Sequence, residues 1–226
     1  MVKPVLCLQT GWSLIKEQYW LFLGITALGL IVGSMGPLGI LLGPMMCGIY
    51  LCLFARLRGE RVGFELLFKG FDYFAQSLIA TLVQAVPVLL LLLPVYALFF
   101  IQFMSKMGGA RTRSRGASVD PSALYSMFAM MGVLVLVVML VSLAIGAFFI
   151  FTYPLIVDRK LAALDALRTS VKAVLANLGG VLGLVLLTTL FSIIGLFFCY
   201  VGAFLVLPVS FAAWAVAYRQ VFPSQG

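Results

Sequence analysis

The chain has 226 residues, of which 64% are hydrophobic and only 10% are charged, with a formal net charge of +8 at pH 7. Water-soluble domains are roughly 45–50% apolar and about 25% charged, so this composition excludes soluble, disordered and disulfide-framework proteins. The bilayer is the expected solvent for most of the chain. Because there is no histidine, Ser-His-Asp and Cys-His catalytic systems and most zinc, copper and haem sites are excluded as well.

Six apolar stretches are long enough for transmembrane helices, which need about 20 residues. Their approximate bounds are Tyr19–Met35, Leu38–Leu57, Phe74–Met104, Ala123–Val157, Leu178–Tyr200 and Val201–Arg219. Uncharged turns at Gly36-Pro37 and near Tyr200-Val201-Gly202 join the first two and the last two stretches into tight hairpins. The first stretch follows a basic segment, as in a signal peptide. Because it pairs directly with the second stretch, we expect it to be retained.

The third and fourth stretches are longer than one bilayer crossing requires, so they must tilt, kink or protrude. Pro87 and Pro94 allow the third to kink. Asp120-Pro121 is a typical helix start for the fourth, with an N-cap carboxylate and a proline at the first helical position. Between them, the Gly-, Ser- and Arg-rich segment 105–119 predicts a flexible loop.

A moderately polar segment with helical periodicity precedes the first, third and fifth stretches. The apolar faces are Val5, Leu8, Trp12, Ile15 and Tyr19 in the first segment, Phe64, Leu67, Phe68, Phe71 and Phe74 in the second, and Leu161, Leu164, Leu167, Val171, Val174 and Leu175 in the third. The charged residues off these faces include Lys16 and Glu17, then Glu65, Lys69 and Asp72, and finally Arg159, Asp165, Arg168 and Lys172. Such helices are typical of the membrane interface; three soluble linker helices are the alternative.

The predicted fold is therefore an all-α polytopic membrane protein with a single transmembrane domain over residues 1–226. It consists of three tandem units, at approximately 1–58, 59–157 and 158–220, and each unit is an interfacial helix followed by a transmembrane hairpin. Pro44 and Pro208 occupy similar depths in the second and sixth stretches, which favours the internal repeat.

Three motifs in this pattern carry a family resemblance. They are Gly11-Trp12 … Gln18, Gly59-Glu60 … Phe68-Lys69-Gly70-Phe71, and Tyr153-Pro154-Leu155-Ile156-Val157-Asp158 … Ala163-Leu164-Asp165-Ala166-Leu167-Arg168-Thr169-Ser170. With them the chain resembles the bacterial YciC-like integral membrane proteins, which are similar to the membrane domain attached to some glycerophosphodiester phosphodiesterases. The resemblance implies a six-helix, multi-pass protein of the bacterial cytoplasmic (inner) membrane. In the fused proteins a separate domain carries out the hydrolysis.

The basic residues predict the orientation. Eleven of the fifteen flank the spans on the side that would hold both termini, namely Lys3, Lys16, Arg56, Arg58, Arg61, Lys69, Arg159, Lys160, Arg168, Lys172 and Arg219. By the positive-inside rule this side is cytoplasmic. Because the basic residues flank the spans, where topology explains them, they give no reason to expect nucleic-acid binding. The predicted loop on the other side carries Lys106, Arg111, Arg113 and Arg115. These cations either contact anionic headgroups, an envelope polymer or a partner, or simply solvate the loop.

No catalytic, cofactor or metal site is predicted. The acidic residues lie in or beside the polar segments, which disfavours a proton-coupled pump. The four cysteines form no CxxC pair and are expected to be apolar filler rather than redox groups. Glycine pairs at GxxxG spacing are candidates for helix packing: Gly29 and Gly33, Gly39 and Gly43, Gly179 and Gly183.

Partner or lipid contacts are expected at Lys69, Asp72, Asp165, Arg168, Lys172, Arg111, Arg113 and Arg115, with interfacial anchors at Trp12, Phe68 and Phe71. The expected partners are membrane lipids with anionic headgroups and either a second copy of the chain or another membrane protein. The predicted function is that of a non-catalytic scaffold, lipid-associated protein or accessory subunit. A small oligomeric transporter or channel is the main alternative, and a lipid-modifying enzyme acting near Asp158 and Arg159 is a third.

Overall fold

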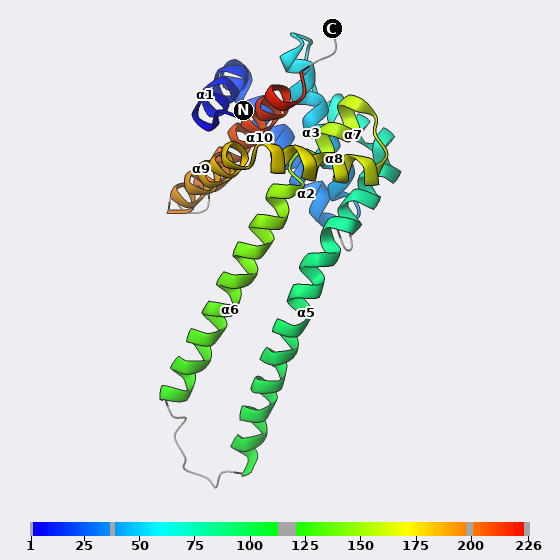
Figure 1. The fold of residues 1–226 in the computed structure, drawn as a ribbon. Helices are drawn as coiled ribbons and strands as arrows, with labels where there is room; N and C mark the ends of the chain where they lie inside the picture. Colours follow the sequence, from blue (N-terminus) through cyan, green and yellow to red (C-terminus); the bar gives the residue numbers. More distant parts are fainter. Residues whose placement is uncertain (1, 37–38, 113–120, 198–200, 224–226) are drawn as a thin grey trace. The chain divides into compact units, whose positions relative to one another are not determined.

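The computed structural model describes residues 2–36, 39–112, 121–197 and 201–223. Within these ranges the protein is built from helices and contains no strand, which confirms the all-α prediction (Figure 1). Five helical stretches of the described chain are long and apolar enough to cross a membrane, so this is a membrane-embedded protein. They are Pro4–Met35, Phe64–Gln102, Met131–Arg159, Leu178–Phe197 and Gly202–Val221. The predicted second span corresponds to a shorter apolar helix, Leu42–Leu57.

The chain divides into two compact units. The core unit comprises Met1–Leu82 and Ala147–Gly226, and the hairpin unit comprises Val83–Gly146. In chain order the helices are α1 (Pro4–Ile15), the 3-10 helix η1 (Lys16–Gln18), α2 (Tyr19–Met35), α3 (Leu42–Leu57), α4 (Phe64–Phe68), the 3-10 helix η3 (Lys69–Tyr73), α5 (Phe74–Thr112), α6 (Pro121–Phe148), α7 (Thr152–Arg159), α8 (Ala163–Ala176), α9 (Leu178–Phe197) and α10 (Val201–Val221).

Helix α3 is the centre of the core unit, where it contacts α2, α4, η3, α7 and α10. Three glycines allow the backbones around it to come very close. A Cβ atom at Gly48 would overlap the carbonyl oxygen of Leu67, and one at Gly70 would overlap the carbonyl oxygen of Pro44. A Cβ at Gly43 would lie 2.6 Å from the carbonyl oxygen of Ser77 at the start of α5. The segment from α4 to α5 is therefore joined to α3 by backbone packing.

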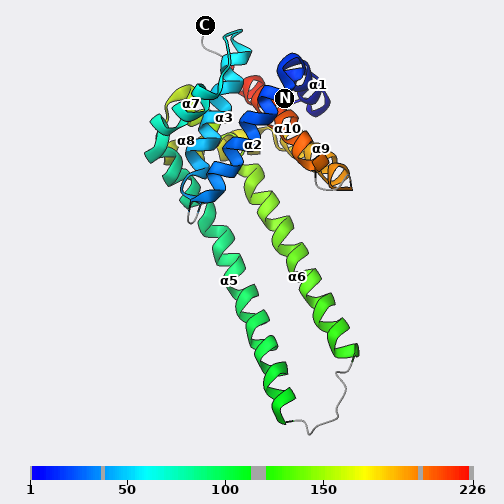
Figure 2. The same cartoon turned by 180° about the vertical axis from the view of Figure 1, so that it is seen from behind.

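Helix α10 lies beside both α1 and α9, as Figures 1 and 2 show from opposite sides. At the turn between α9 and α10, a Cβ atom at Gly195 would lie 2.7 Å from the carbonyl carbon of Gly202. Along α3 and α10, Tyr50 contacts Phe211 and Phe54 contacts Tyr218. The partners follow each other in the same order on both helices, so α3 and α10 run parallel.

The predicted fourth span is divided by a break. Helix α6 begins at Pro121, the first helical position indicated by the sequence, but it ends at Phe148, and α7 starts at Thr152. Pro154 lies in the first turn of α7, where its missing N–H is not needed. The hydroxyl of Ser170 on α8 accepts from the Phe151 N–H (3.2 Å) and donates to the Phe148 carbonyl (2.9 Å). These bonds satisfy backbone groups that the break leaves without helical partners.

The first part of the predicted loop at 105–119 is helical, because α5 continues to Thr112 and also runs through Pro87 and Pro94. Residues 113–120 lie outside the described part of the chain. A helix satisfies its own backbone hydrogen bonds, so α5 can extend through this polar segment without a packing partner. Pro37 and Tyr200, in the two predicted uncharged turns, also lie outside the described residues.

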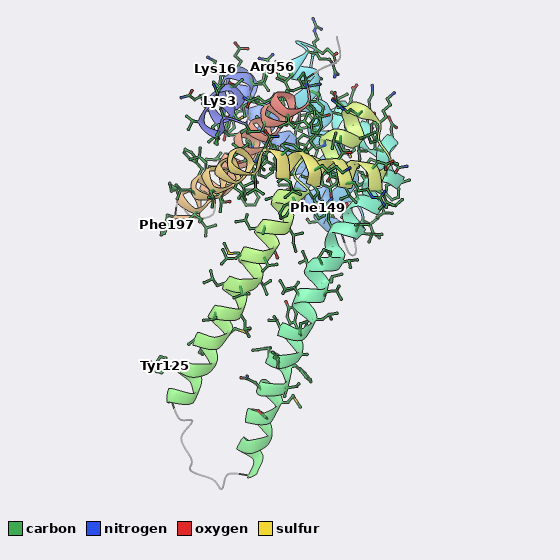
Figure 3. The ribbon with its side chains drawn as sticks, in the orientation of Figure 1. Lys3, Lys16, Arg56, Tyr125, Phe149 and Phe197 are labelled. Carbon is green, nitrogen blue, oxygen red and sulfur yellow. The ribbon has the colours of Figure 1, made fainter. Side chains whose placement is uncertain are left out.

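The hairpin unit exposes large apolar side chains along both of its helices (Figure 3). On α6, the consecutive residues Val135, Leu136 and Val137 are all exposed. Successive helical residues point about 100° apart, so these three side chains expose more than half of the helix circumference at this level. Met131, Leu134, Val138 and Ser142, three to four residues apart, are half-buried on the remaining side. A helix that exposes this much apolar surface requires lipid or a protein neighbour. At 39 residues, α5 is about 58 Å long and exceeds the ~30 Å hydrocarbon core.

Candidate functional site

The second amphipathic segment, α4 with η3, has two apolar sides. Leu67 and Gly70 are buried against α3. The four phenylalanines of the predicted face are between 37% and 47% exposed: Phe64, Phe68, Phe71 and Phe74. The rings of Phe71 and Phe74 stack with their centroids 6.4 Å apart. The predicted anchors Phe68 and Phe71 thus belong to an exposed aromatic surface, and Glu65, Lys69 and Asp72 are exposed in the same segment.

The third amphipathic segment is α8, which has one buried side and one exposed side. The side against the core unit consists mainly of small residues: Ala163, Ala166, Leu167, Ser170 and Val174. Leu164 and Leu175, from the predicted apolar face, are 54% and 56% exposed. Asp165, Arg168 and Lys172 are exposed on the same side of the helix as these leucines. The helix is held at its start by the side-chain oxygen of Gln76, which accepts from the Ala163 N–H at 2.9 Å.

The first amphipathic segment, α1, packs through a face that the sequence pattern did not indicate. Its buried residues are Cys7, Gly11 and Ile15, spaced four apart. A Cβ atom at Gly11 would lie 2.7 Å from the backbone nitrogen of Ala213 on α10. The predicted anchor Trp12 is 48% exposed. The large apolar residues of α1 therefore remain available on the side away from this contact.

These exposed residues of α1 form one wall of an apolar groove of about 810 Å³. On α1 the lining includes Val5, Leu8, Gln9 and Trp12. The other walls come from Tyr19 and Trp20 at the start of α2, from Leu187 and Phe191 on α9, and from Leu205, Val206 and Val209 on α10. Nearly all of this lining is apolar. The volume of the groove lies within the ~300–1,000 Å³ typical of small-molecule sites.

An aromatic cluster lies along the groove between α1 and α2. Tyr19 contacts the rings of both Trp12 and Trp20, with centroids 5.7 Å apart in each pair. The Tyr19 hydroxyl donates to the carbonyl oxygen of Leu205 on α10 at 2.6 Å. This bond fixes the tyrosine ring between α2 and α10. Tryptophan and tyrosine are enriched at membrane–water interfaces, where an apolar ring and a polar tip are both accommodated.

One end of α1 is tied to α3 by an ion pair. Arg56 contacts Glu17 at 2.6 Å and also donates from Nε to the Leu14 carbonyl oxygen at 3.1 Å. Lys16, next to Glu17, is exposed and forms no ion pair within the part of the chain that the structure describes. It is the first residue of η1 and is not among the residues that line the groove.

A second polar cluster joins the C-terminal ends of α3, α7 and α10. The Asp158 carboxylate accepts from the Tyr218 hydroxyl at 2.8 Å and from both terminal nitrogens of Arg219 at 2.8 and 3.3 Å. The Arg219 guanidinium lies 4.7 Å from the centre of the Phe54 ring, a cation–π contact. Asp158 and Arg219 are both largely buried. We call these four residues the Asp158 cluster.

The contacts within the Asp158 cluster stabilise the structure. Its carboxylate is held by three donors, and a cation at the C-terminal end of a helix is favoured by the helix dipole. Arg159, the other residue named for lipid-modifying chemistry, lies 4.8 Å from the centre of the Phe222 ring. A carboxylate occupied in this way links three helices and is poorly placed to act as a general acid or base.

The loop after α3 carries an exposed ion pair in which Arg58 contacts Glu60 at 2.6 Å. The hydrogen bond from Arg58 lowers the pKa of the Glu60 carboxyl group. Such exposed pairs contribute little to stability. Among the described residues, no group of three or more cysteine, aspartate or glutamate side chains is placed to hold a metal ion.

The predicted helix-packing glycines lie in different surroundings. A Cβ atom at Gly29 or Gly33 would come within 3.0–3.1 Å of α3 residues, and one at Gly43 would lie 2.6 Å from the Ser77 carbonyl oxygen of α5. Gly183 faces Pro4 of α1 at 3.0 Å, whereas Gly179 faces open space. Gly39 lies in the turn before α3 with φ +69°, a conformation that favours glycine.

The predicted contacts of the 105–119 segment are largely outside the described structure. Arg111 lies at the end of α5, and Arg113 and Arg115 lie outside the described residues. Cys7, Cys47 and Cys52 are buried free thiols, and Cys199 lies outside the described residues.

Sequence reasoning missed the groove and the Asp158 cluster. The signal for the groove was the four-residue spacing of Cys7, Gly11 and Ile15, a small-residue face beside the large-residue one on α1. The Asp158 cluster brings together residues 60 positions apart in the chain, and no local pattern reports such a contact. In comparisons with known proteins, no family model matches this chain, and no curated protein or solved structure matches it.

Proposed function

We propose that this protein is a non-catalytic, lipid-associated component of the bacterial cytoplasmic membrane, where it acts as a scaffold or accessory subunit. The observation that carries the proposal is the exposed side of α8. One side of the helix packs on the core unit, and the opposite side exposes Leu164 and Leu175 towards one edge and Asp165 and Lys172 towards the other, with Arg168 between them. A helix whose exposed side carries both leucines and charges is stabilised where hydrocarbon and water meet.

The second amphipathic segment supports the same proposal. Full burial of such a side chain is worth about 1.5–3 kcal/mol, and the four phenylalanines, 37–47% exposed, would forgo part of this if they remained in water. Because α4 and η3 are joined to α3 through Gly48 and Gly70, this aromatic surface is presented by a fixed scaffold. The exposed Lys69 and Asp72 offer both signs of charge beside it. Mixed charge suits a headgroup region or a protein partner better than a site for free anions.

The proposed topology has six spans and both termini in the cytoplasm, as in the YciC-like family that the chain resembles. The span that is added to the five long helical stretches is α3, the predicted second span, whose 16 residues extend about 24 Å. That length is close to the ~30 Å of hydrocarbon, and the adjoining turn residues make up the difference. The eleven basic residues at the proposed cytoplasmic side support the orientation.

A transporter or channel is the second candidate, and a buried polar group in the core unit favours it. The Thr81 hydroxyl lies 3.0 Å from the Tyr153 hydroxyl and donates to the Ser77 carbonyl oxygen. The nearby Thr152 hydroxyl on α7 is buried without a hydrogen-bond partner in the described structure. Polar residues within spans are frequent in translocation pathways.

Flux measurements separate the two candidates. The purified full-length chain is reconstituted into liposomes loaded with potassium or with small anionic and neutral solutes. For a lipid-associated scaffold we expect release no faster than from empty liposomes. Selective release that falls when Tyr153→Phe and Thr81→Val are combined would establish the transporter and overturn the scaffold.

A further inference from the structure

We propose that residues 149–151, the break between α6 and α7, form a joint with two states. In the broken state, which the structure shows, the Ser170 hydroxyl on α8 holds the backbone groups on both sides of the joint. In the continuous state, α6 and α7 form one helix, which the Thr152 hydroxyl stabilises. This inference goes beyond the proposed function and does not depend on it.

The hydroxyl of Thr152, at the start of α7, differs from those of the other buried threonines. The Thr152 side chain is fully buried, and its hydroxyl has no hydrogen-bond partner in the described structure. In the same part of the chain, the other three buried threonines each donate to the carbonyl oxygen four residues earlier, at 2.8–3.0 Å: Thr26 to Phe22, Thr81 to Ser77 and Thr188 to Leu184. A buried hydroxyl without a partner costs free energy, so the broken state leaves Thr152 in need of an acceptor.

The acceptor that Thr152 would use is the carbonyl oxygen of Phe148, four residues earlier, and Ser170 occupies it. The Ser170 hydroxyl donates to this oxygen at 2.9 Å. The Thr152 N–H, which an α-helix would also direct to Phe148, bonds instead to the Phe149 carbonyl oxygen at 3.0 Å. If the helix were continuous, Phe148 could accept from Thr152, and Ser170 could return its hydroxyl to the Ala166 carbonyl oxygen within α8. Serine and threonine therefore compete for one carbonyl group, and each favours a different state.

Pro154 opposes the continuous state and so balances the gain at Thr152. Proline lacks an N–H, and in a helix its ring crowds the carbonyl group four residues earlier, here that of Ile150. Other helices of this chain tolerate the same arrangement, because α5 runs through Pro87 and Pro94 and α10 runs through Pro208. Ser170 and Pro154 thus favour the break, whereas the Thr152 hydroxyl favours its closure.

The two helices that meet at the joint are restrained differently. In α7, Leu155 and Ile156 are fully buried, and the Asp158 cluster ties its end to α10. At the end of α6, near the position where Figure 3 labels Phe149, a Cβ atom at Gly146 would meet no atom within 4 Å. Because Ser170 belongs to α8, a binding event that displaces α8 would release the Phe148 carbonyl group and favour the continuous state.

Distances between two spin labels test the proposal. Cysteines replace Val141 on α6 and Lys160 just after α7, both of which are exposed, in the full-length chain whose four native cysteines are changed to alanine. In one continuous helix these two positions are about 28 Å apart, at 1.5 Å per residue, and a bend at the joint shortens this distance. With the native residues at the joint, in proteoliposomes, we expect double electron–electron resonance to show mainly the shorter distance.

Three substitutions should shift the balance in known directions. Ser170→Ala should raise the population at the longer distance severalfold, and adding Thr152→Val, which keeps the side-chain shape without the hydroxyl, should reverse this increase. Pro154→Ala removes the obstacle to the helix and should also raise that population, which provides the reference for the continuous state. Ser210→Ala and Thr188→Val are the controls. Their hydroxyls bond within their own helices, so the distance distribution should not change.

An unchanged distribution in Ser170→Ala, or an increase that persists when Thr152→Val is added, would overturn the proposal. If Ser170→Ala does not fold, Pro154→Ala decides, with and without Thr152→Val: absence of the longer distance, or no effect of the lost hydroxyl, would overturn the proposal as well. Liposome flux and label distances are separate readouts. A failure of the scaffold function therefore leaves the joint standing, and a failure of the joint leaves the scaffold function standing.

Discussion

At the scale of single residues, glycines and one arginine determine how the core unit is assembled. Where Gly48 meets Leu67 and Gly11 meets Ala213, backbones touch directly, so dispersion contacts replace the apolar driving force that lipid does not supply. Arg219 donates a hydrogen bond to the Asp158 carboxylate and lies over the Phe54 ring. Its largely buried positive charge is therefore stabilised both by the carboxylate and by the ring. Each arrangement predicts a sharp response to a small substitution.

Asp158→Asn should destabilise the core unit. The change leaves Arg219 largely buried beside a neutral amide, and hydrogen bonds to charged groups contribute about 1.5–3 kcal/mol each. We expect a lower midpoint of thermal unfolding in detergent, measured by circular dichroism. The matched control is Glu60→Gln, which removes the exposed partner of Arg58 and should leave the midpoint unchanged. Equal midpoints for the two variants would show that the Asp158 cluster contributes no net stability.

Gly48→Ala should also destabilise the protein, because the added Cβ would overlap the Leu67 carbonyl oxygen. Overpacking of this kind costs about 1–3 kcal/mol, more than the helix propensity that alanine gains. Gly179→Ala on α9, where the Cβ would meet open space, is the control and should be neutral or stabilising by up to about 1 kcal/mol. Denaturation of both variants in the same detergent gives the comparison. A tolerated Gly48→Ala would contradict the close packing of α3 with α4.

At the scale of elements, the sequence pattern predicted the existence of the helices better than the faces they bury. Bounds such as Pro121 and Leu178 follow from proline and hydropathy. The buried side of α8, in contrast, centres on Ala163, Ala166 and Ser170 rather than on its leucines. Periodicity finds large apolar residues, but in lipid these face outward and small residues pack inward. The break after Phe148 was missed because its cap, Ser170, lies on another helix.

This reversal predicts different roles for the two sides of α4 and η3. Combining Phe68→Asp with Phe71→Asp removes the exposed aromatic surface but leaves Leu67 and Gly70 against α3. We expect stability in detergent to change little, while in proteoliposomes the segment loses its contact with lipid. A cysteine at Phe64 reports this contact by its labelling with a membrane-impermeant maleimide, which should rise severalfold. Lys69→Ala is the control and should leave labelling low. Unchanged labelling in the aspartate variant would contradict the interfacial position of the segment.

At the scale of the whole molecule, the two units differ in what they require from their surroundings. The core unit buries aromatic residues such as Tyr50, Phe54 and Tyr218 in its interior. The hairpin unit exposes apolar residues over most of the circumference of α6, and this arrangement is stable only where hydrocarbon or a partner protein covers them. The composition predicted a membrane protein. It did not predict that the core unit would be well packed while the hairpin unit would bury few side chains. That difference depends on tertiary contacts, which overall hydropathy does not record.

The topology of the whole chain is predicted by its basic residues. With six spans and both termini cytoplasmic, single cysteines at residues 36, 110 and 201 should all react with an impermeant maleimide from outside intact cells. Cys199→Ser removes the native thiol nearest to residue 201, and Cys7, Cys47 and Cys52 are buried. The prediction rests on eleven basic residues at the cytoplasmic side against four in the segment 105–119. A cysteine replacing Arg61, in the loop between α3 and α4, is the control and should react only after permeabilisation. If residue 110 behaved like residue 61, the segment 105–119 would be cytoplasmic. The six-span topology would then be wrong, and its arginines would obey the positive-inside rule after all.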